Sequence, residues 1–216
     1  MTTAAPALSP AITRRLVGVV PVNMQLDVFW DAIRTARASA KLAGLDHSPS
    51  LMIAWSITQA MQKHPAFRCT VEPDGSILEH AIFDLGVAVA LDGDRLATAA
   101  IHEANRLDWR GFAAAYGRAV ADTRAGRLEN VQAPLILTSL GAFGIETATP
   151  IVVPPAMSTL FLGKAHQRMI SKNGVVQPVE VVTLSLTFDH RVVNGIGAAA
   201  FLHDMKVQTE GFTVPE

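Results

Sequence analysis

Apolar residues recur at helical spacing in three segments of the chain. In the segment 27–43 they are Phe29, Ile33, Ala36 and Ala40. This spacing predicts an amphipathic helix capped by Asp27. The segment 48–64 is apolar on nearly all sides, and Ser48 followed by Pro49 is a typical helix start, so we expect a buried helix that ends before Pro65.

The third helical segment begins after Asp108, a good N-cap. Its apolar stripe consists of Trp109, Phe112, Tyr116 and Val120. Regularly spaced apolar residues usually face the core, so we interpret this stripe as core rather than as a cofactor site. A final helix is predicted from Gly195, with Asn194 as its N-cap.

Runs rich in β-branched and apolar residues predict the strands. Two hairpins are expected, 67–72 with 76–82 around Pro73-Asp74-Gly75, and 86–92 with 95–101 around Asp92-Gly93-Asp94. Further strands are predicted at 16–24, 134–140, 149–154, 158–165 and 178–188. Together with the helices they indicate a mixed α/β fold, an α+β sandwich with one large sheet.

The longest strand, 178–188, alternates strictly near its end. Leu184, Leu186 and Phe188 share one face, and Thr183, Ser185 and Thr187 share the other. Because strand side chains alternate with a period of two, His190 is expected to leave the strand on the apolar face.

Composition narrows the class of protein. A length of 216 residues with 50% hydrophobic residues suits one domain, which we place at 16–216 after a flexible lead of residues 1–15. The net charge of -1 has no basic block, so nucleic acid and anionic membranes are not expected partners. Cys69 is the only cysteine and the chain has neither a secretory signal nor a long apolar run, so we expect a cytoplasmic protein.

Several kinds of site find no support in the sequence. Six of the seven histidines lack a neighbouring ligand at metal-binding spacing, so no metal site is expected. Neither a glycine-rich phosphate loop nor a Gly-x-Ser-x-Gly elbow is present, and Cys69 has no histidine close in sequence.

The stretch TFDHRVVNGIG, residues 187–197, is the exception. A histidine at the end of a buried strand, just before a tight turn into a helix, is fixed in position and can act as a general base. The residues alone leave an alternative open, in which Asp189 and Arg191 are solvated, His190 is a satisfied core residue and Asn194 only caps a helix.

The same stretch resembles the signature of a known family. LSLTFDHRVVNGIGAAAFL, residues 184–202, is similar to the strand, Asp-His-Arg, Asp-Gly and alanine-rich helix of the dihydrolipoamide acyltransferases, the catalytic cores of 2-oxo acid dehydrogenase complexes. Segments 86–104, 119–128, 137–144 and 149–165 match further parts of that family in the same order. The resemblance implies a fold like that of chloramphenicol acetyltransferase.

The resemblance also implies a reaction. In that family a histidine deprotonates the thiol of coenzyme A or dihydrolipoamide, and the thiolate attacks an acyl thioester directly. Carried over, His190 is the base, and Thr138 takes the place of the serine whose hydroxyl stabilises the oxyanion. The family builds each active site between two subunits, so a homotrimer is implied. No residue that binds coenzyme A can be assigned.

Two departures from the family pattern affect this expectation. Asn194 stands where the resemblance leads us to expect an aspartate, and an amide keeps the helix cap but loses a charge-assisted bond. The chain also shows neither a lipoyl domain nor a subunit-binding domain, so we expect no covalent lipoyl group on it and any dihydrolipoyl substrate to come from a separate lipoyl-bearing protein. The polar C-terminal segment favours an isolated trimer over a larger shell.

The sequence therefore supports a coenzyme A-dependent acyltransferase with His190, Thr138 and Asn194 as its site residues. A non-catalytic structural or binding subunit of the same trimeric fold is an alternative, motivated by Asn194. A third is an enzyme of this fold that serves a biosynthetic step on another small acceptor.

Overall fold

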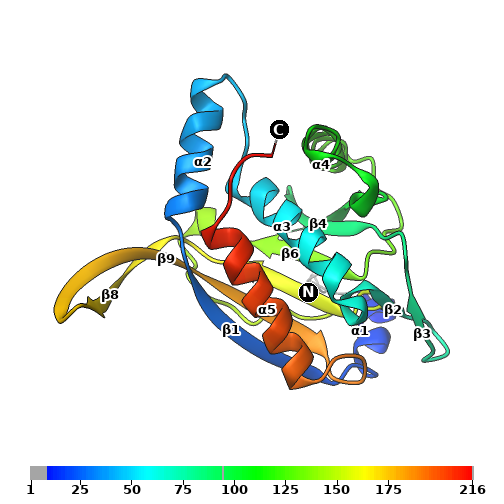
Figure 1. Ribbon diagram of the computed structural model, residues 1–216. Helices are drawn as coiled ribbons and strands as arrows, with labels where there is room; N and C mark the ends of the chain where they lie inside the picture. Colours follow the sequence, from blue (N-terminus) through cyan, green and yellow to red (C-terminus); the bar gives the residue numbers. More distant parts are fainter. Residues whose placement is uncertain (1–8, 94, 216) are drawn as a thin grey trace, which may run out of the picture.

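The computed structural model describes residues 9–93 and 95–215 of the chain (Figure 1). Its helices are α1 (Pro10–Leu16), α2 (Asp31–Leu42), α3 (Pro49–Lys63), α4 (Trp109–Arg124) and α5 (Gly195–Glu210), with short 3₁₀ turns at Pro65–Arg68, Ala104–Arg106 and Gly141–Phe143. Its strands are β1 (Pro21–Phe29), β2 (Cys69–Val71), β3 (Ile77–Glu79), β4 (Leu85–Leu91), β5 (Arg95–Ile101), β6 (Leu135–Ser139), β7 (Ser158–Leu162), β8 (His166–Lys172) and β9 (Val175–Asp189).

Seven of these strands form one mixed sheet in the order β1-β9-β7-β6-β4-β5, with β8 pairing the far half of β9. Strands β2 and β3 form a separate hairpin. Helices α3, α4 and α5 lie over one face of the large sheet, and β8 with the start of β9 extends away from the body as an arm (Figure 1). The predicted mixed α/β architecture with a large sheet is therefore confirmed.

The predicted alternation along β9 is confirmed. Leu184, Leu186 and Phe188 belong to the core beneath the helices. They are joined there by apolar residues of β6 and β7, namely Leu135, Leu137, Leu160 and Leu162. Burial of these side chains is the main force that holds the helices on the sheet.

The opposite face of β9 is also buried, although it carries hydroxyl groups. Each hydroxyl has a partner, because Asn23 Nδ2 donates to Thr187 at 3.0 Å, Thr147 and Ser185 share a bond of 3.1 Å, and Thr183 donates to Asp27 at 2.7 Å. Buried hydroxyl groups are tolerated when they are paired in this way.

The N-terminal prediction needs correction. The first strand is β1 (Pro21–Phe29) rather than 16–24, and Asp27 lies inside it instead of capping a helix. Its carboxylate binds Thr183 and pairs with Arg168, and β1 runs antiparallel to β9 along its whole length. Helix α2 begins at Asp31, and Ile33, Ala36 and Ala40 form its buried face as predicted. Phe29, the fourth residue of the predicted stripe, is instead the exposed last residue of β1.

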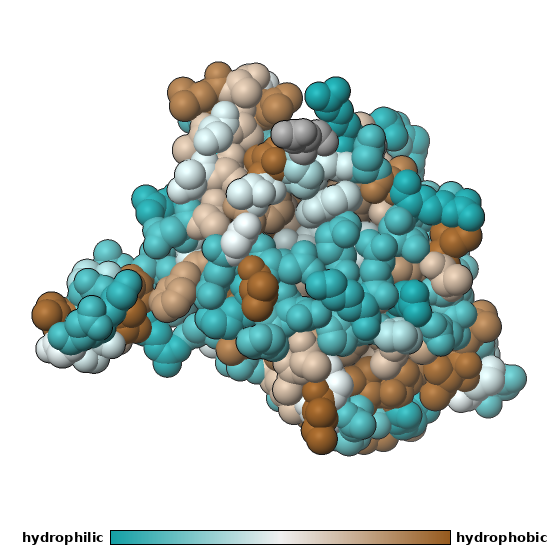
Figure 2. All heavy atoms as spheres, viewed as in Figure 1, coloured by the Kyte–Doolittle hydropathy of each residue, from teal (hydrophilic) through white to brown (hydrophobic). Residues whose placement is uncertain are grey.

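Three other segments differ from expectation. The lead of residues 1–15 contains helix α1, in which Ser9 caps the first turn, whereas residues 1–8 lie outside the described chain. The segment 149–154 is irregular, because Pro150 and Pro154 have no N–H for a strand ladder and Thr159 binds the carbonyl of Ile151 at 2.8 Å. The exposed strand β8 was not predicted; it carries mixed polar and apolar residues (Figure 2).

The two predicted hairpins and three predicted caps are present. Strands β2 and β3 pair around Gly75, and β4 and β5 pair around Gly93, although Asp94 of that turn lies outside the described residues. Ser48, Asp108 and Asn194 each accept a hydrogen bond from the first turn of their helices. Within the described residues, none of the helices is long and apolar enough to cross a membrane.

Candidate active site

His190 follows the last residue of β9, and its side chain is exposed. Its backbone N–H donates to the carbonyl of Val20 at 2.8 Å, which ties it to the chain just before β1. The imidazole ring lies 6.0 Å from the ring of Phe188, which belongs to the core beneath the helices. The residue therefore combines a fixed backbone with a solvent-accessible ring.

The neighbouring Asp189 fixes this position further. It is 1% exposed, and its carboxylate accepts bonds from the backbone amides of Val20 at 3.4 Å and Arg191 at 3.1 Å. The Arg191 guanidinium binds both carboxylate oxygens, with Nε 3.0 Å from each. The alternative in which Asp189 is solvated is therefore wrong.

Two opposing effects determine the pKa of the Asp189 carboxyl beside Arg191. Burial raises the pKa of the Asp189 carboxyl, but the hydrogen bonds from Arg191 and Val20 and the charge of Arg191 outweigh it and leave the pKa below its ordinary value. The same contact raises the pKa of Arg191. The carboxylate is thus held ionised beside the histidine.

Asn194 is the N-cap of α5. Its side-chain oxygen accepts the backbone N–H of Gly197 at 2.8 Å, and the residue is exposed. This is the helix-capping contact that the residue type predicts. Within the described chain Asn194 has this contact and none with the imidazole of His190.

Thr138 lies near the end of β6 and is half-buried. Leu137, its neighbour in the strand, faces the core beneath the helices, so Thr138 faces the other side of the sheet. The chain after it turns tightly, because Ser139 binds the carbonyl of Leu162 at 2.9 Å and a Cβ on Gly141 would lie 3.0 Å from the Gly163 carbonyl.

The structure does not bring Thr138 and His190 together within one chain. Thr138 aligns with Phe161 of β7 and, through it, with Ser185 of β9, five residues before His190. With a rise of about 3.3 Å per residue and about 4.8 Å between strands, the two positions are roughly 19 Å apart. Each predicted site residue is therefore separately placed, and a site that uses both requires two copies of the chain.

Sequence reasoning missed two features of this region. Val20, which binds Asp189 and His190, lies 169 residues before Asp189, and nothing in the local sequence announces such a contact. Gly163 allows a close approach, since a Cβ there would lie 1.9 Å from the carbonyl of Glu146. A glycine directly after a buried apolar strand is the signal that could have suggested this approach.

Among the described residues, no group of three or more His, Cys, Asp and Glu side chains is arranged to hold a metal ion. The residues that the structure describes do not identify a ligand of coenzyme A.

Comparison with known proteins decides the family. Residues 11–213 match the model of the 2-oxoacid dehydrogenases acyltransferase catalytic domain. The chain belongs to this family.

The dihydrolipoyllysine-residue acetyltransferase component of the acetoin cleaving system of Bacillus subtilis is 34% identical over 154 residues. The match covers 70% of this chain and 38% of that protein. The chain spans less than half the length of the curated relatives that match it, and these relatives are other acyltransferase components of this family.

Solved structures of acyltransferase cores share the fold. A probable dihydrolipoamide acetyltransferase from Listeria monocytogenes superposes with a TM-score of 0.84 at 22% identity, covering 98% of this chain and 96% of that one. Chloramphenicol acetyltransferase superposes with a TM-score of 0.58 at 16% identity, covering 90% of each chain. The predicted family and the predicted chloramphenicol acetyltransferase-like fold are both confirmed.

A third structure is a dihydrolipoamide acetyltransferase of Azotobacter vinelandii, with a TM-score of 0.81, 23% identity, and coverage of 93% of this chain and 85% of that one. Its study concerns the catalytic roles of a serine, of a histidine 52 residues after it and of an asparagine 4 residues after the histidine.

Proposed function

We propose that this acyltransferase domain transfers an acyl group between coenzyme A and a dihydrolipoyl thiol, or another small acceptor, with His190 as general base. The observation that carries the proposal is the combination of an exposed imidazole with a backbone fixed by Val20 and a buried, ionised Asp189. A general base needs access to its substrate and a defined position, and both are met here.

The reaction is a direct transfer. The imidazole of His190 takes the proton of the acceptor thiol, and the thiolate sulfur attacks the carbonyl carbon of the acyl thioester. The hydroxyl of Thr138 from a neighbouring subunit donates to the oxyanion of the tetrahedral intermediate. The intermediate collapses, the C–S bond of the donor breaks, and the leaving thiolate takes the proton back from the imidazolium. No acyl-enzyme is formed.

The spacing of the three residues supports these roles. Thr138 precedes His190 by the same interval as the serine precedes the histidine in the Azotobacter vinelandii study, and Asn194 follows His190 at the same interval as its asparagine. An asparagine at this place therefore does not in itself argue for lost activity. Threonine keeps the hydroxyl donor of serine.

The separation of roughly 19 Å between Thr138 and His190 in one chain supports a site shared between subunits. Closed symmetric assemblies repeat such a shared site at every interface. We propose the homotrimer that the family resemblance implies, with no bound metal and with coenzyme A as a substrate.

The acceptor and the location rest on other observations. Relatives of this chain are named as dihydrolipoyllysine-residue acyltransferase components, which supports a lipoyl acceptor that is carried outside this domain. The single cysteine supports a cytoplasmic location.

The direct test measures release of free coenzyme A from acetyl-CoA with dihydrolipoamide and then with a panel of small thiols, amines and alcohols. His190→Ala should lower the rate by about 10² to 10⁴-fold, the usual contribution of a general base. His203→Ala is the matched control, because His203 is also an exposed histidine and lies on α5. Equal rates in the two variants for every acceptor would exclude His190 as the base.

A non-catalytic subunit of the same fold is the second candidate. This candidate is supported by the hydrogen bond that caps α5, because the bond explains an asparagine at position 194 without a catalytic role. Asn194→Asp separates the two, since an aspartate also caps a helix. A large gain in activity would indicate a subunit that had lost its reaction, whereas loss of an existing activity would indicate that the asparagine serves catalysis.

A further inference from the structure

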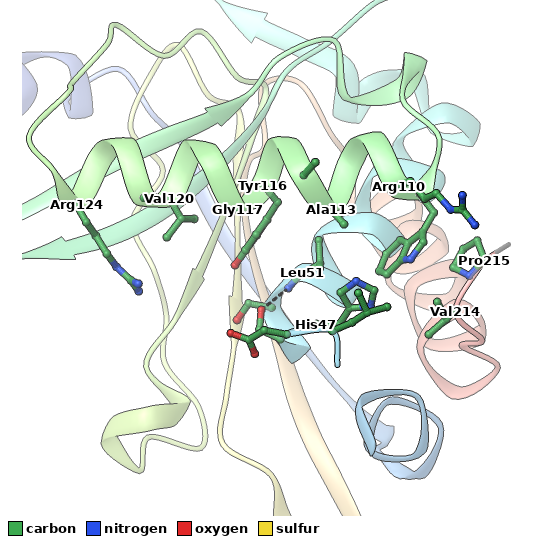
Figure 3. Close-up of a pocket in the computed structure, with 17 residues that line it drawn as sticks. His47, Leu51, Arg110, Ala113, Tyr116, Gly117, Val120, Arg124, Val214 and Pro215 are labelled. Atoms are coloured by element: carbon green, nitrogen blue, oxygen red, sulfur yellow. Dashed lines mark hydrogen bonds between the residues drawn. The ribbon is translucent and has the colours of Figure 1, made fainter. Parts of the chain in front are cut away.

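A groove runs along α4, far from His190. It has a volume of about 970 Å³ and three walls: the segment 45–51 before and at the start of α3, one face of α4, and residues Val214 and Pro215 after α5 (Figure 3). We call it the α4 groove. Helix α5 separates it from the His190 turn, and its 16 residues span about 24 Å. The groove is therefore not part of the site described above.

The two ends of the α4 groove differ in chemistry. At one end lie Trp109, His47, Val214 and Pro215, with the cationic Arg110 beside them (Figure 3). His47 packs edge-on against Trp109, with ring centroids 5.1 Å apart. Apart from Arg110, this end offers aromatic and aliphatic groups, of which Trp109 is only 4% exposed.

The other end is polar and cationic. Figure 3 shows Tyr116 and Arg124 projecting from α4 toward the chain at the start of α3. Burial raises the pKa of Tyr116, while the nearby Ser48 and Ser50 hydroxyls and the charge of Arg124 lower it in part. Asp46 also lines the α4 groove and provides the one carboxylate among its lining residues.

Two positions in the groove are unexplained by the protein's own packing. Gly117 sits in the middle of α4, where glycine costs about 1 kcal/mol relative to alanine, yet a Cβ there would meet no described atom within 4 Å. The Nδ1 atom of His47 is buried and has no hydrogen-bond partner among the described residues. Gly117 leaves the middle of the groove wall open, whereas the Nδ1 atom of His47 is closed off from solvent and does not face the groove.

We propose that the α4 groove binds a small amphipathic molecule whose apolar body lies against Trp109 and Val214 and whose single anionic group binds Arg124 and the Tyr116 hydroxyl. The volume lies in the range of small-molecule pockets, which are mostly apolar with a few converging polar groups. Three walls enclose it, which suits a small molecule better than the flat surface of a protein. Among the described residues neither of the two arginines that line the groove, Arg110 and Arg124, forms an ion pair, and Arg124 lies at the end of Tyr116 (Figure 3).

The test uses two fluorescent probes of one shape, 1-anilinonaphthalene-8-sulfonate and its uncharged analogue N-phenyl-1-naphthylamine. Both should bind the whole protein saturably and quench tryptophan emission, because Trp109 forms part of the groove wall. Gly117→Leu should abolish this binding by filling the groove. Leucine favours a helix more than glycine does and meets no neighbour at its Cβ, so the melting temperature should not fall.

A second variant tests the anionic end. Arg124→Gln should weaken the sulfonate about tenfold and leave the uncharged probe unchanged, because only the sulfonate gains a charge-assisted bond. Arg118→Gln is the matched control, since Arg118 is an exposed arginine of α4 that does not line the groove. It should change neither probe.

Three outcomes would overturn the proposal. If Gly117→Leu binds the probes as well as the wild type does, the probes bind outside the α4 groove. If Arg124→Gln weakens the binding of both probes equally, Arg124 does not bind the anionic group. A change in the molar mass of Gly117→Leu by light scattering would show that a second copy of the chain covers the groove.

Discussion

The turn that holds His190 and the strand end that holds Thr138 are built in different ways. At the His190 turn, a buried carboxylate, a guanidinium and a backbone segment from the other end of the chain fix the residue. At Thr138, ordinary strand pairing through Phe161 fixes the residue, and the hydroxyl faces away from the helix-covered core. The first region is held by polar contacts and the second by a sheet.

This difference agrees with the roles proposed for the two residues. A base must stay ionisable and accessible while its backbone is rigid, which requires specific polar contacts around it. A hydroxyl donor needs only a fixed strand, since it carries no charge. Because the two regions lie roughly 19 Å apart in one chain, the proposed active site takes each of them from a different chain.

After His190→Ala, removing the hydroxyl of Thr138 should give the largest loss of activity. Thr138→Ala should lower kcat by about 10² to 10³-fold with little change in KM, because an oxyanion donor acts mainly in the transition state. Thr138→Ser keeps the donor and should retain most of the activity. Steady-state kinetics on both variants provide the check, and similar losses in the two would argue against the oxyanion role.

Removing the charge beside His190 should affect both stability and rate. Asp189→Asn should cost about 2 kcal/mol in the free energy of unfolding, because hydrogen bonds to charged groups contribute about 1.5 to 3 kcal/mol. It should also lower kcat, because the histidine loses its fixed backbone. Denaturant unfolding and acyl transfer rates measure the two effects.

The pH dependence of that variant gives an independent check. The pKa of Asp189 is lower in the folded protein than its unfolded value of roughly 3.9, so its stabilisation is complete above pH 4 and is lost as the pH falls through the folded pKa. The difference in stability between the wild type and Asp189→Asn should therefore shrink below pH 4. A constant difference from pH 7 to pH 3 would mean that ionisation is not the cause.

The smallest effect is expected at the helix cap. Asn194→Ala should cost about 1 kcal/mol of stability through loss of the bond to Gly197. Asp108→Ala is the matched control, because Asp108 caps α4 through an equivalent bond of 2.7 Å. If Asn194 only caps, both variants should lose similar stability and neither should lose activity. An activity loss confined to Asn194→Ala would assign it a role beyond the cap.

The sequence predicted the local parts of this account better than the distant ones. Alternation along β9 and the cap at Asn194 are local patterns, and both are confirmed. The contact of Val20 with Asp189 joins the two ends of the chain and has no local signal. The prediction that Asp27 caps a helix was wrong for the same reason. Aspartate is a typical helix cap, but Asp27 lies in a strand and binds Thr183, which is 156 residues away in the sequence.

The most direct test of a site shared between subunits is complementation. His190→Ala and Thr138→Ala chains are unfolded together in equal amounts, refolded and assayed for acyl transfer. Random assembly should restore about a quarter of the wild-type activity, because one interface in four combines an intact His190 with an intact Thr138. Activity no higher than that of the separately refolded variants, in mixed assemblies verified by mass, would show that the two residues do not act across subunits.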